Sequence, residues 1–206
     1  VERGDVALQQ LTADDGVVSA ANSLRLDGSQ LETTGDLLLE AKDSVVMRDS
    51  DQPFVALAGG ELRVRGEDAI DIFTLNHPES GLFSGGDMVF QSANPVGGDA
   101  HFATGGNFRI EDLDENFGDL NSPNDPVIRA NGDVSLESYV GASLHIFAGG
   151  SVVIPGTVRI IGPDNTDGSI QEIVTLSDGK TVLNINGNTE PVLDIRAGTT
   201  VVRCPE

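Results

Sequence analysis

The amino-acid sequence predicts an all-β protein: a parallel β-helix (solenoid) with short loops at the corners between its strands. Three observations indicate this fold. One strand phrase recurs along the chain, apolar and polar residues alternate strictly within each copy, and glycine stands at the start of each copy. The 206 residues fit one domain or one elongated array of repeats. We therefore expect a single domain over residues 1–206, with regular coils over 1–156 and terminal coils or a cap over 157–206.

The recurring phrase is a glycine, a polar residue, and then an apolar residue at every second position. It occurs as GDVAL (Gly4), GDLLL (Gly35), GELRV (Gly60), GDMVF (Gly86), GNFRI (Gly106), GDVSL (Gly132) and GSVVI (Gly150). The spacings between copies are 31, 25, 26, 20, 26 and 18 residues. A loose period of this length is typical of a solenoid.

Alternation within the copies indicates half-buried strands. The apolar pairs that share one face are Val6/Leu8, Leu37/Leu39, Leu62/Val64, Met88/Phe90, Phe108/Ile110, Val134/Leu136 and Val152/Ile154. The opposite face takes Asp5, Asp36, Glu61, Asp87, Asn107, Asp133 and Ser151. A helix of 3.6 residues per turn does not place residues two apart on one face, whereas a strand does.

Two further strand phrases complete each period. One precedes several copies, in Pro53–Gly60, Asp99–Gly106, Pro126–Gly132 and Ser143–Gly150, and another follows some copies, in Ser44–Ser50 and Asp68–Phe73. We expect loops at 76–85 and 111–126, and left-handed backbone at the corner glycines. Residues 13–24 come closest to a helical pattern, which Gly16 and the β-branched residues weaken. A jelly roll or β-sandwich is the competing all-β interpretation.

The net charge of −21 argues against nucleic acid as a partner, because phosphate binding needs a surplus of Lys and Arg. The sequence has no apolar run long enough to span a bilayer, so we expect no membrane insertion. The single cysteine, Cys204, excludes an internal disulfide and a zinc site built from cysteines. Outward-facing acids would oppose unplanned association between sheets.

The segment GDVSLESYVGASLHIFAGGSVVIPGTVRIIGPD (132–164) and the later TLSDGKTVLNINGNTEPVLDIRAGT (175–199) resemble filamentous-haemagglutinin-type adhesins of the two-partner secretion class, in their cyanobacterial form. The resemblance implies a right-handed β-helix that is exported across the outer membrane and displayed extracellularly or on the cell surface. It also implies a segment downstream of the secretion module. Its partners would be neighbouring modules or copies of itself stacked head-to-tail, and surface glycans or other cells.

The motif NTDG (165–168) is similar to one element of the polygalacturonase family, whose further motifs, a paired Asp, Gly-His-Gly and Arg-x-Lys, do not follow in this sequence. Hydrolysis of a glycosidic bond needs two carboxylates that flank it. We therefore predict that the protein is not an enzyme and has no catalytic residues. A hydrolase or lyase that acts on polysaccharide along the β-helix remains the alternative function, with Asp68, Asp71 and Asp87 as its candidate residues.

Metal and ligand sites are weakly indicated. Asp112, Asp114, Glu115 and Asp119 lie in an acidic stretch that offers oxygen ligands to calcium, but their spacing fits neither an EF-hand nor a calcium-binding nonapeptide. We expect no cofactor apart from this calcium candidate. His101 and His145 occupy equivalent positions before a Gly-Gly pair, and His77 lies in a loop. The scarcity of aromatic residues argues against a carbohydrate-binding module.

Overall fold

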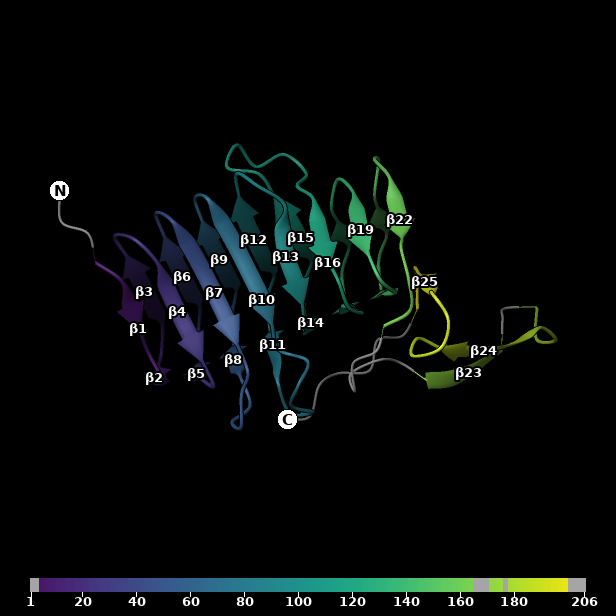
Figure 1. Cartoon of the computed structure of the whole chain (residues 1–206), viewed down its shortest axis with the longest axis horizontal. Coiled ribbons are helices and arrows are strands. Elements are labelled where there is room, and N and C mark those ends of the chain that lie inside the picture. The colour runs from purple at the N-terminus through teal and green to yellow at the C-terminus, as the bar shows by residue number, and fades with distance from the viewer. Residues whose placement is uncertain (1–3, 165–170, 176–177, 200–206) are drawn as a thin grey trace.

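The chain folds into a parallel β-helix made of three sheets that run side by side along the molecule (Figure 1). The computed structural model describes residues 4–164, 171–175 and 178–199. Successive strands pass from sheet A to sheet B to sheet C and back to sheet A, so that each of the first seven coils contributes one strand to every sheet. The predicted fold class is confirmed.

Sheet A stacks eight strands, and each pairs in parallel with the equivalent strand of the next coil. They are β1 (Val6–Ala7), β4 (Leu24–Asp27), β7 (Ser44–Arg48), β10 (Ala69–Phe73), β13 (Val96–Asp99), β16 (Leu120–Ser122), β19 (Tyr139–Gly141) and β22 (Val158–Ile160). At about 4.8 Å per coil, eight stacked strands extend over about 34 Å.

Sheets B and C repeat the same arrangement on the two other sides. Sheet B holds β2 (Gln10–Ala13), β5 (Gln30–Thr33), β8 (Val55–Ala58), β11 (Gly81–Ser84), β14 (His101–Thr104), β17 (Val127–Ala130), β20 (Leu144–Ala148) and β25 (Leu193–Arg196). Sheet C holds β3 (Gly16–Ala20), β6 (Leu37–Ala41), β9 (Leu62–Gly66), β12 (Met88–Ser92), β15 (Phe108–Glu111), β18 (Val134–Ser135) and β21 (Val152–Val153). An antiparallel hairpin, β23 (Gln171–Thr175) and β24 (Val182–Asn186), lies outside these sheets.

The core consists of apolar rows that run along the axis. Register places Leu62 beside Met88 and Met88 beside Phe108, and all three side chains are fully buried. At mid-length Phe90, Phe102 and Phe108 form a cluster whose ring centroids are 5.3–5.6 Å apart. The two-residue alternation in the sequence therefore reports which side chains face the core.

The first copy of the strand phrase lies in a different sheet from the other six copies. GDVAL begins β1 of sheet A, whereas the other six copies form sheet C. The sheet C strand of the first coil is β3, which pairs in register with β6 and lies in the stretch that came closest to a helical pattern. The spacing of 31 residues is longer than the others because it was measured from a strand of sheet A to a strand of sheet C.

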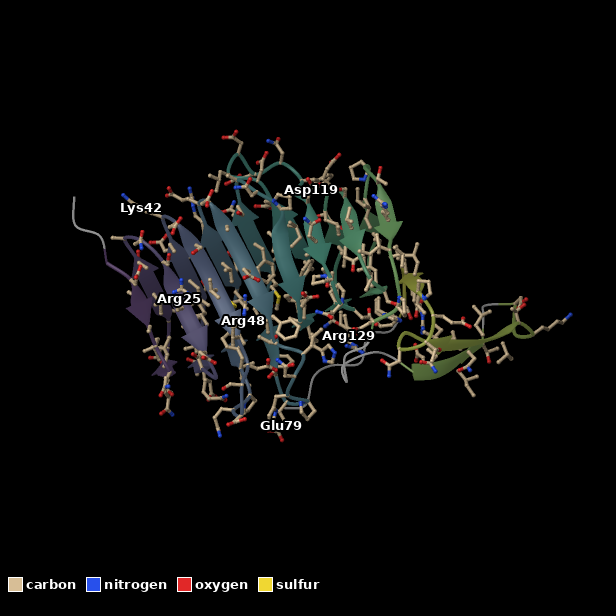
Figure 2. The ribbon with its side chains drawn as sticks, in the orientation of Figure 1. Arg25, Lys42, Arg48, Glu79, Asp119 and Arg129 are labelled. Atoms are coloured by element: carbon tan, nitrogen blue, oxygen red, sulfur yellow. The ribbon has the colours of Figure 1, made fainter. Side chains whose placement is uncertain are left out.

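Both predicted loops are shorter than expected. β11 occupies residues 81–84 and β16 occupies 120–122, so the loops cover 74–80, 112–119 and 123–126. Turn-forming residues next to these short strands concealed them. Figure 2 shows Lys42 and Asp119 along the edge where sheet C turns into sheet A, and Glu79 of loop 74–80 at the opposite edge.

The corner between sheets B and C carries a ladder of side-chain oxygens. Asp36 Oδ1 accepts the backbone N–H of Glu61 (2.7 Å), one coil further on. Asp87, Asn107 and Asp133 make the same bond to the next coil, at 2.7–2.9 Å. The polar residue of the strand phrase therefore bonds one coil to the next.

Corner glycines are required by close approach and not by left-handed backbone. Among the described residues, positive φ occurs only at Gly28, Gly179, Gly198 and Glu115. A Cβ at Gly60 would overlap Asp36 Oδ1 of the coil before, and one at Gly85 would overlap the carbonyl oxygen of Gly59. At Gly60 the ladder oxygen, and at Gly85 a backbone carbonyl oxygen, occupies the space that a side chain would need. The expectation of positive φ was wrong at the corner between sheets B and C, whereas Gly28, between sheets A and B, has positive φ.

Gly60→Ala should destabilise the fold by about 2–3 kcal/mol, because its methyl group displaces the Asp36 carboxylate from the Glu61 N–H. In an Asp36→Ala background the same change should cost less, with a coupling free energy of at least about 1 kcal/mol. Chemical denaturation of the four proteins measures this coupling. Gly162→Ala, where a Cβ meets open space, is the matched control. Additive effects of the two substitutions would contradict the explanation.

Asp133→Ala should lower the free energy of unfolding by about 1 kcal/mol, because Ser151 loses its acceptor. Asp133→Asn should be close to neutral, since an amide oxygen accepts equally well and Asn107 already fills one position of the ladder. Thermal unfolding of the two variants makes the comparison. Equal destabilisation by both would mean that charge, not the hydrogen bond, matters at this position.

Candidate functional site

Buried ionisable side chains gather where sheet A turns into sheet B in the last coils. Asp99 lies at the end of β13, Asp125 precedes β17, Asp164 follows β22, and His145 belongs to β20. Each of these four side chains is at least 95% buried. Burial of so many charged groups is costly unless they are paired, so this cluster is the chemically most distinctive site among the described residues.

Asp125 and His145 form a fully buried pair, with Asp125 Oδ1 2.7 Å from His145 Nδ1. Nε2 of His145 is buried and has no hydrogen-bond partner in the part of the chain that the structure describes. A carboxylate that orients an imidazole in this way is the arrangement of a general base. Because both side chains have zero exposure, no substrate reaches them in this conformation, and the pair is a closed contact between two coils.

Asp99 and Tyr139 extend the cluster. Desolvation by burial raises the pKa of Asp99, although Ser122 Oγ and the N–H of Asn124 (3.0 Å) donate hydrogen bonds to its carboxylate. Burial likewise raises the pKa of Tyr139, whose hydroxyl donates to the carbonyl oxygen of Ser143 (2.7 Å). Tyr139 is therefore a neutral hydrogen-bond donor at physiological pH.

The calcium candidates do not converge on one point. Asp112 Oδ1 accepts the N–H groups of Asp114 (2.8 Å) and Asn116 (2.9 Å). Hydrogen bonds from Asn116 hold the pKa of Asp112 below its ordinary value. Glu115 adopts left-handed backbone in this loop, and Asp119 accepts a hydrogen bond from Ser138 Oγ of the next coil. Within the described ranges, no three His, Cys, Asp or Glu side chains are grouped to hold a metal ion.

The candidate residues for polysaccharide chemistry lie on different sides of the rod. Asp68 accepts a hydrogen bond from Asn94 (3.1 Å) at the corner between sheets C and A, and Asp71 pairs with Arg48 on the outer face of sheet A. Asp87 lies at the corner between sheets B and C. Partial burial opposes its ionisation, but hydrogen bonds from Asn107 and Arg109 lower its pKa. The three carboxylates therefore do not flank a common bond.

His101 and His145 occupy the same row of sheet B, with Val127 between them. His77 lies in loop 74–80, where its N–H donates to Asp49 Oδ2 (2.7 Å). The motif at 165–168 and Cys204 lie outside the described residues. The Asp125–His145 pair was missed because the two residues are a full coil apart in sequence. Its only signal was the equivalent phase of the two histidines.

A hollow of about 330 Å³ lies on the outside of the first three coils, where sheet C meets its corner with sheet A. Ser19, Glu40, Lys42, Arg65 and Glu67 line it. Glu40 is in register with Arg65, so the two signs of charge alternate between neighbouring coils. The two acidic and two basic side chains that line the hollow therefore balance one another in charge.

Known proteins give no family assignment for this chain. No family model matches the chain, and neither a curated protein nor a solved structure matches it. The part of the chain that the structure describes contains no helix with the length and hydrophobicity needed to cross a bilayer.

Asp99→Asn should raise the free energy of unfolding at pH 7 by about 1 kcal/mol, because it removes a buried charge and keeps an acceptor for Ser122. The raised pKa of Asp99 means that the folded state takes up this proton more readily than the unfolded state. The gain should therefore shrink as pH falls through that pKa. Denaturation curves between pH 7 and pH 3.5 test this, and a gain independent of pH would contradict it.

Proposed function

We propose that this protein is a non-catalytic structural module: a stiff β-helix segment of a secreted, surface-displayed fibre that serves adhesion. The observation that carries the proposal is that, among the described residues, each of the three sheets ends in an unpaired strand edge at both ends of the rod. β1, β2 and β3 form one end, and β22, β25 and β21 form the other. Strand edges of this kind are templates for further pairing.

The core is uncovered at the same two ends. Val6, Leu8 and Leu11 at one end, and Val152, Val158 and Ile160 at the other, are only partly buried although they continue fully buried rows. Solenoids need their ends covered by a polar cap or by another repeat. Adjoining coils of the same geometry, from neighbouring modules or from another copy stacked head-to-tail, would cover them in the proposed fibre.

Stiffness follows from how the coils are joined. The first seven coils are bonded to one another through three parallel sheets, and the ladder at the corner between sheets B and C adds a bond wherever Asp36, Asp87, Asn107 or Asp133 supplies its oxygen. Since each repeat contacts only its neighbours, adding coils adds length without changing the cross-section. This design suits a spacer that holds contact surfaces away from a cell.

Loops 74–80 and 112–119 are the proposed contact elements. Loop 74–80 is fixed by the preceding coil, because Asp49 of that coil accepts hydrogen bonds from Asn76 (2.9 Å), the N–H of His77 and Ser80 Oγ (3.1 Å). The second is ordered by Asp112. Rigid loops on a regular scaffold bind with little loss of conformational entropy. The resemblance of residues 132–199 to filamentous-haemagglutinin-type adhesins supports the adhesive and secreted parts of this proposal.

Removal of residues 37–61, one coil by the register of Leu37 with Leu62, should leave a cooperatively folded rod. Small-angle X-ray scattering should show a maximum dimension shorter by about 5 Å. Removal of residues 38–61 is the matched control, because a shift of one residue turns apolar side chains outward and should destabilise the protein.

The adhesive part is tested with protein-coated beads on cell surfaces and immobilised polysaccharides. Beads coated with the natural protein should be retained on these surfaces. Beads coated with a variant in which a short glycine-serine turn replaces loop 74–80 or 112–119 should be retained in at least tenfold smaller number. Release of reducing or unsaturated sugars from acidic or neutral polysaccharides, with or without calcium, would refute the non-catalytic assignment and favour the enzyme alternative.

A further inference from the structure

A hairpin interrupts the last coil at the corner between sheets A and B. The next strand after β22 in that coil is β25, and β23 and β24 are inserted between them. Arg196 of β25 pairs with Glu172 of β23, which ties the hairpin to the rod. In Figure 1 the hairpin extends beyond β22 and β25 along the long axis, level with the corners that join sheet A to sheet B.

The described part of the hairpin's turn, from Asp178 onward, is held by hydrogen bonds. Asp178 Oδ1 accepts the N–H groups of Lys180 (2.9 Å) and Thr181 (2.8 Å), and Gly179 supplies the left-handed backbone. Hydrogen bonds from Thr181 lower the pKa of Asp178 to about 2. Asp178 is therefore ionised at any physiological pH, and it presents Lys180 at the tip.

One face of the hairpin carries two exposed apolar side chains beside the polar residues Thr175 and Asn184. The antiparallel register places Ile173 and Val182 on the same face, with 76% and 60% of their surfaces exposed. Of the eleven large hydrophobic residues that are exposed among the described residues, seven lie between Val153 and Ile195. A two-stranded hairpin is marginally stable by itself, and apolar surface gathered in one place marks an interaction site.

We infer that the hairpin is a clasp for a second copy of this chain, which stacks its first coil on the last coil of the first copy; this inference rests on the proposed fibre function. Five-residue strands reach about 17 Å, which matches the rise of about three coils. In such a stack the hairpin lies along the corner between sheets A and B in the first three coils of the second copy.

That corner is complementary to the hairpin. Its residues in the first three coils (8–9, 28–29 and 49–54) include the exposed Asp51 and no Lys or Arg; the exposed Asp27 at the end of β4, in register with Arg48 at the end of β7, adjoins them. Lys180 at the tip is exposed and has no ion pair among the described residues. Leu57 of β8, next to the corner, is 40% exposed and offers an apolar contact for Ile173 and Val182. The tip would reach the third coil, where Asp51 lies.

Cross-linking by a carbodiimide tests this contact, because the reagent joins an amine to a carboxylate only when the two touch. The chain has two lysines, Lys42 and Lys180. Lys180→Arg keeps the charge but removes the amine, and should abolish the dimer that is cross-linked through position 180; Lys42→Arg is the matched control and should not. Peptide mass spectrometry should identify a link from Lys180 to Asp51 or Asp27. A dimer joined through Lys42, or through Lys180 to the second hairpin, would overturn the inference.

Sedimentation velocity over a range of concentrations measures the association itself. Ile173→Asp with Val182→Asp should weaken self-association at least tenfold, whereas Val140→Asp, at an exposed apolar side chain on sheet A, should leave it unchanged. Lys180→Glu should weaken it, and Asp51→Lys added to Lys180→Glu should restore it. Association that the hairpin variants leave unchanged, or none in the natural sequence, would overturn the clasp. The proposed fibre function is tested separately, by the scattering and bead measurements.

Discussion

The structure depends on the hydrogen bond from a side-chain oxygen of one coil to the backbone N–H at the same position in the next. This bond fixes axial register at the corner between sheets B and C, where Asp36, Asp87, Asn107 and Asp133 supply the oxygen. Because the oxygen lies above the following coil, the residue beneath it has no room for a Cβ. One interaction thus accounts for both the repeated acid and the repeated glycine.

The acidic composition follows from the same arrangement. Each Asp of the corner ladder is the acceptor in a hydrogen bond between two coils. Some Arg residues on the outer faces form ion pairs with carboxylates of the same or the neighbouring coil. Arg109 pairs with Asp87 on the preceding coil, while Arg63 pairs with Glu61 of its own coil (2.7 Å). Such partly exposed pairs contribute little individually. The surplus acids make the lateral faces mutually repulsive, which in the proposed fibre would restrict association to the ends.

Much of the fold could be predicted because alternation and glycine position report local geometry. The sheet C strands that follow Gly35, Gly60, Gly86, Gly106 and Gly132 lie where the strand phrase placed them. GDVAL was grouped with the sheet C strands because this strand of sheet A uses the same residue types. β11 and β16 were hidden among turn-forming residues, since pairing with the neighbouring coils, and not local propensity, makes them strands.

The buried cluster could not be predicted in the same way. Asp125 and His145 become neighbours only when the coil length between them is known, and that length varies along the chain. Alternation also suggests that outward residues are exposed, yet His145 faces outward from sheet B and is fully buried. The acidic loop at 112–119 was visible in the sequence. Its hydrogen bonding to itself through Asp112 was not.

The length of strand pairing differs from coil to coil along sheet C, and this difference has a mechanical consequence. Tension along the axis loads the hydrogen bonds between coils along their own direction, so the rod parts where one coil-to-coil interface holds the fewest bonds. In sheet C, β6 and β9 are in register over five residues, whereas β15 and β18, and β18 and β21, are in register over two. A fibre built from this chain would therefore yield first in its carboxy-terminal third, while the coils around β6 to β12 remain intact.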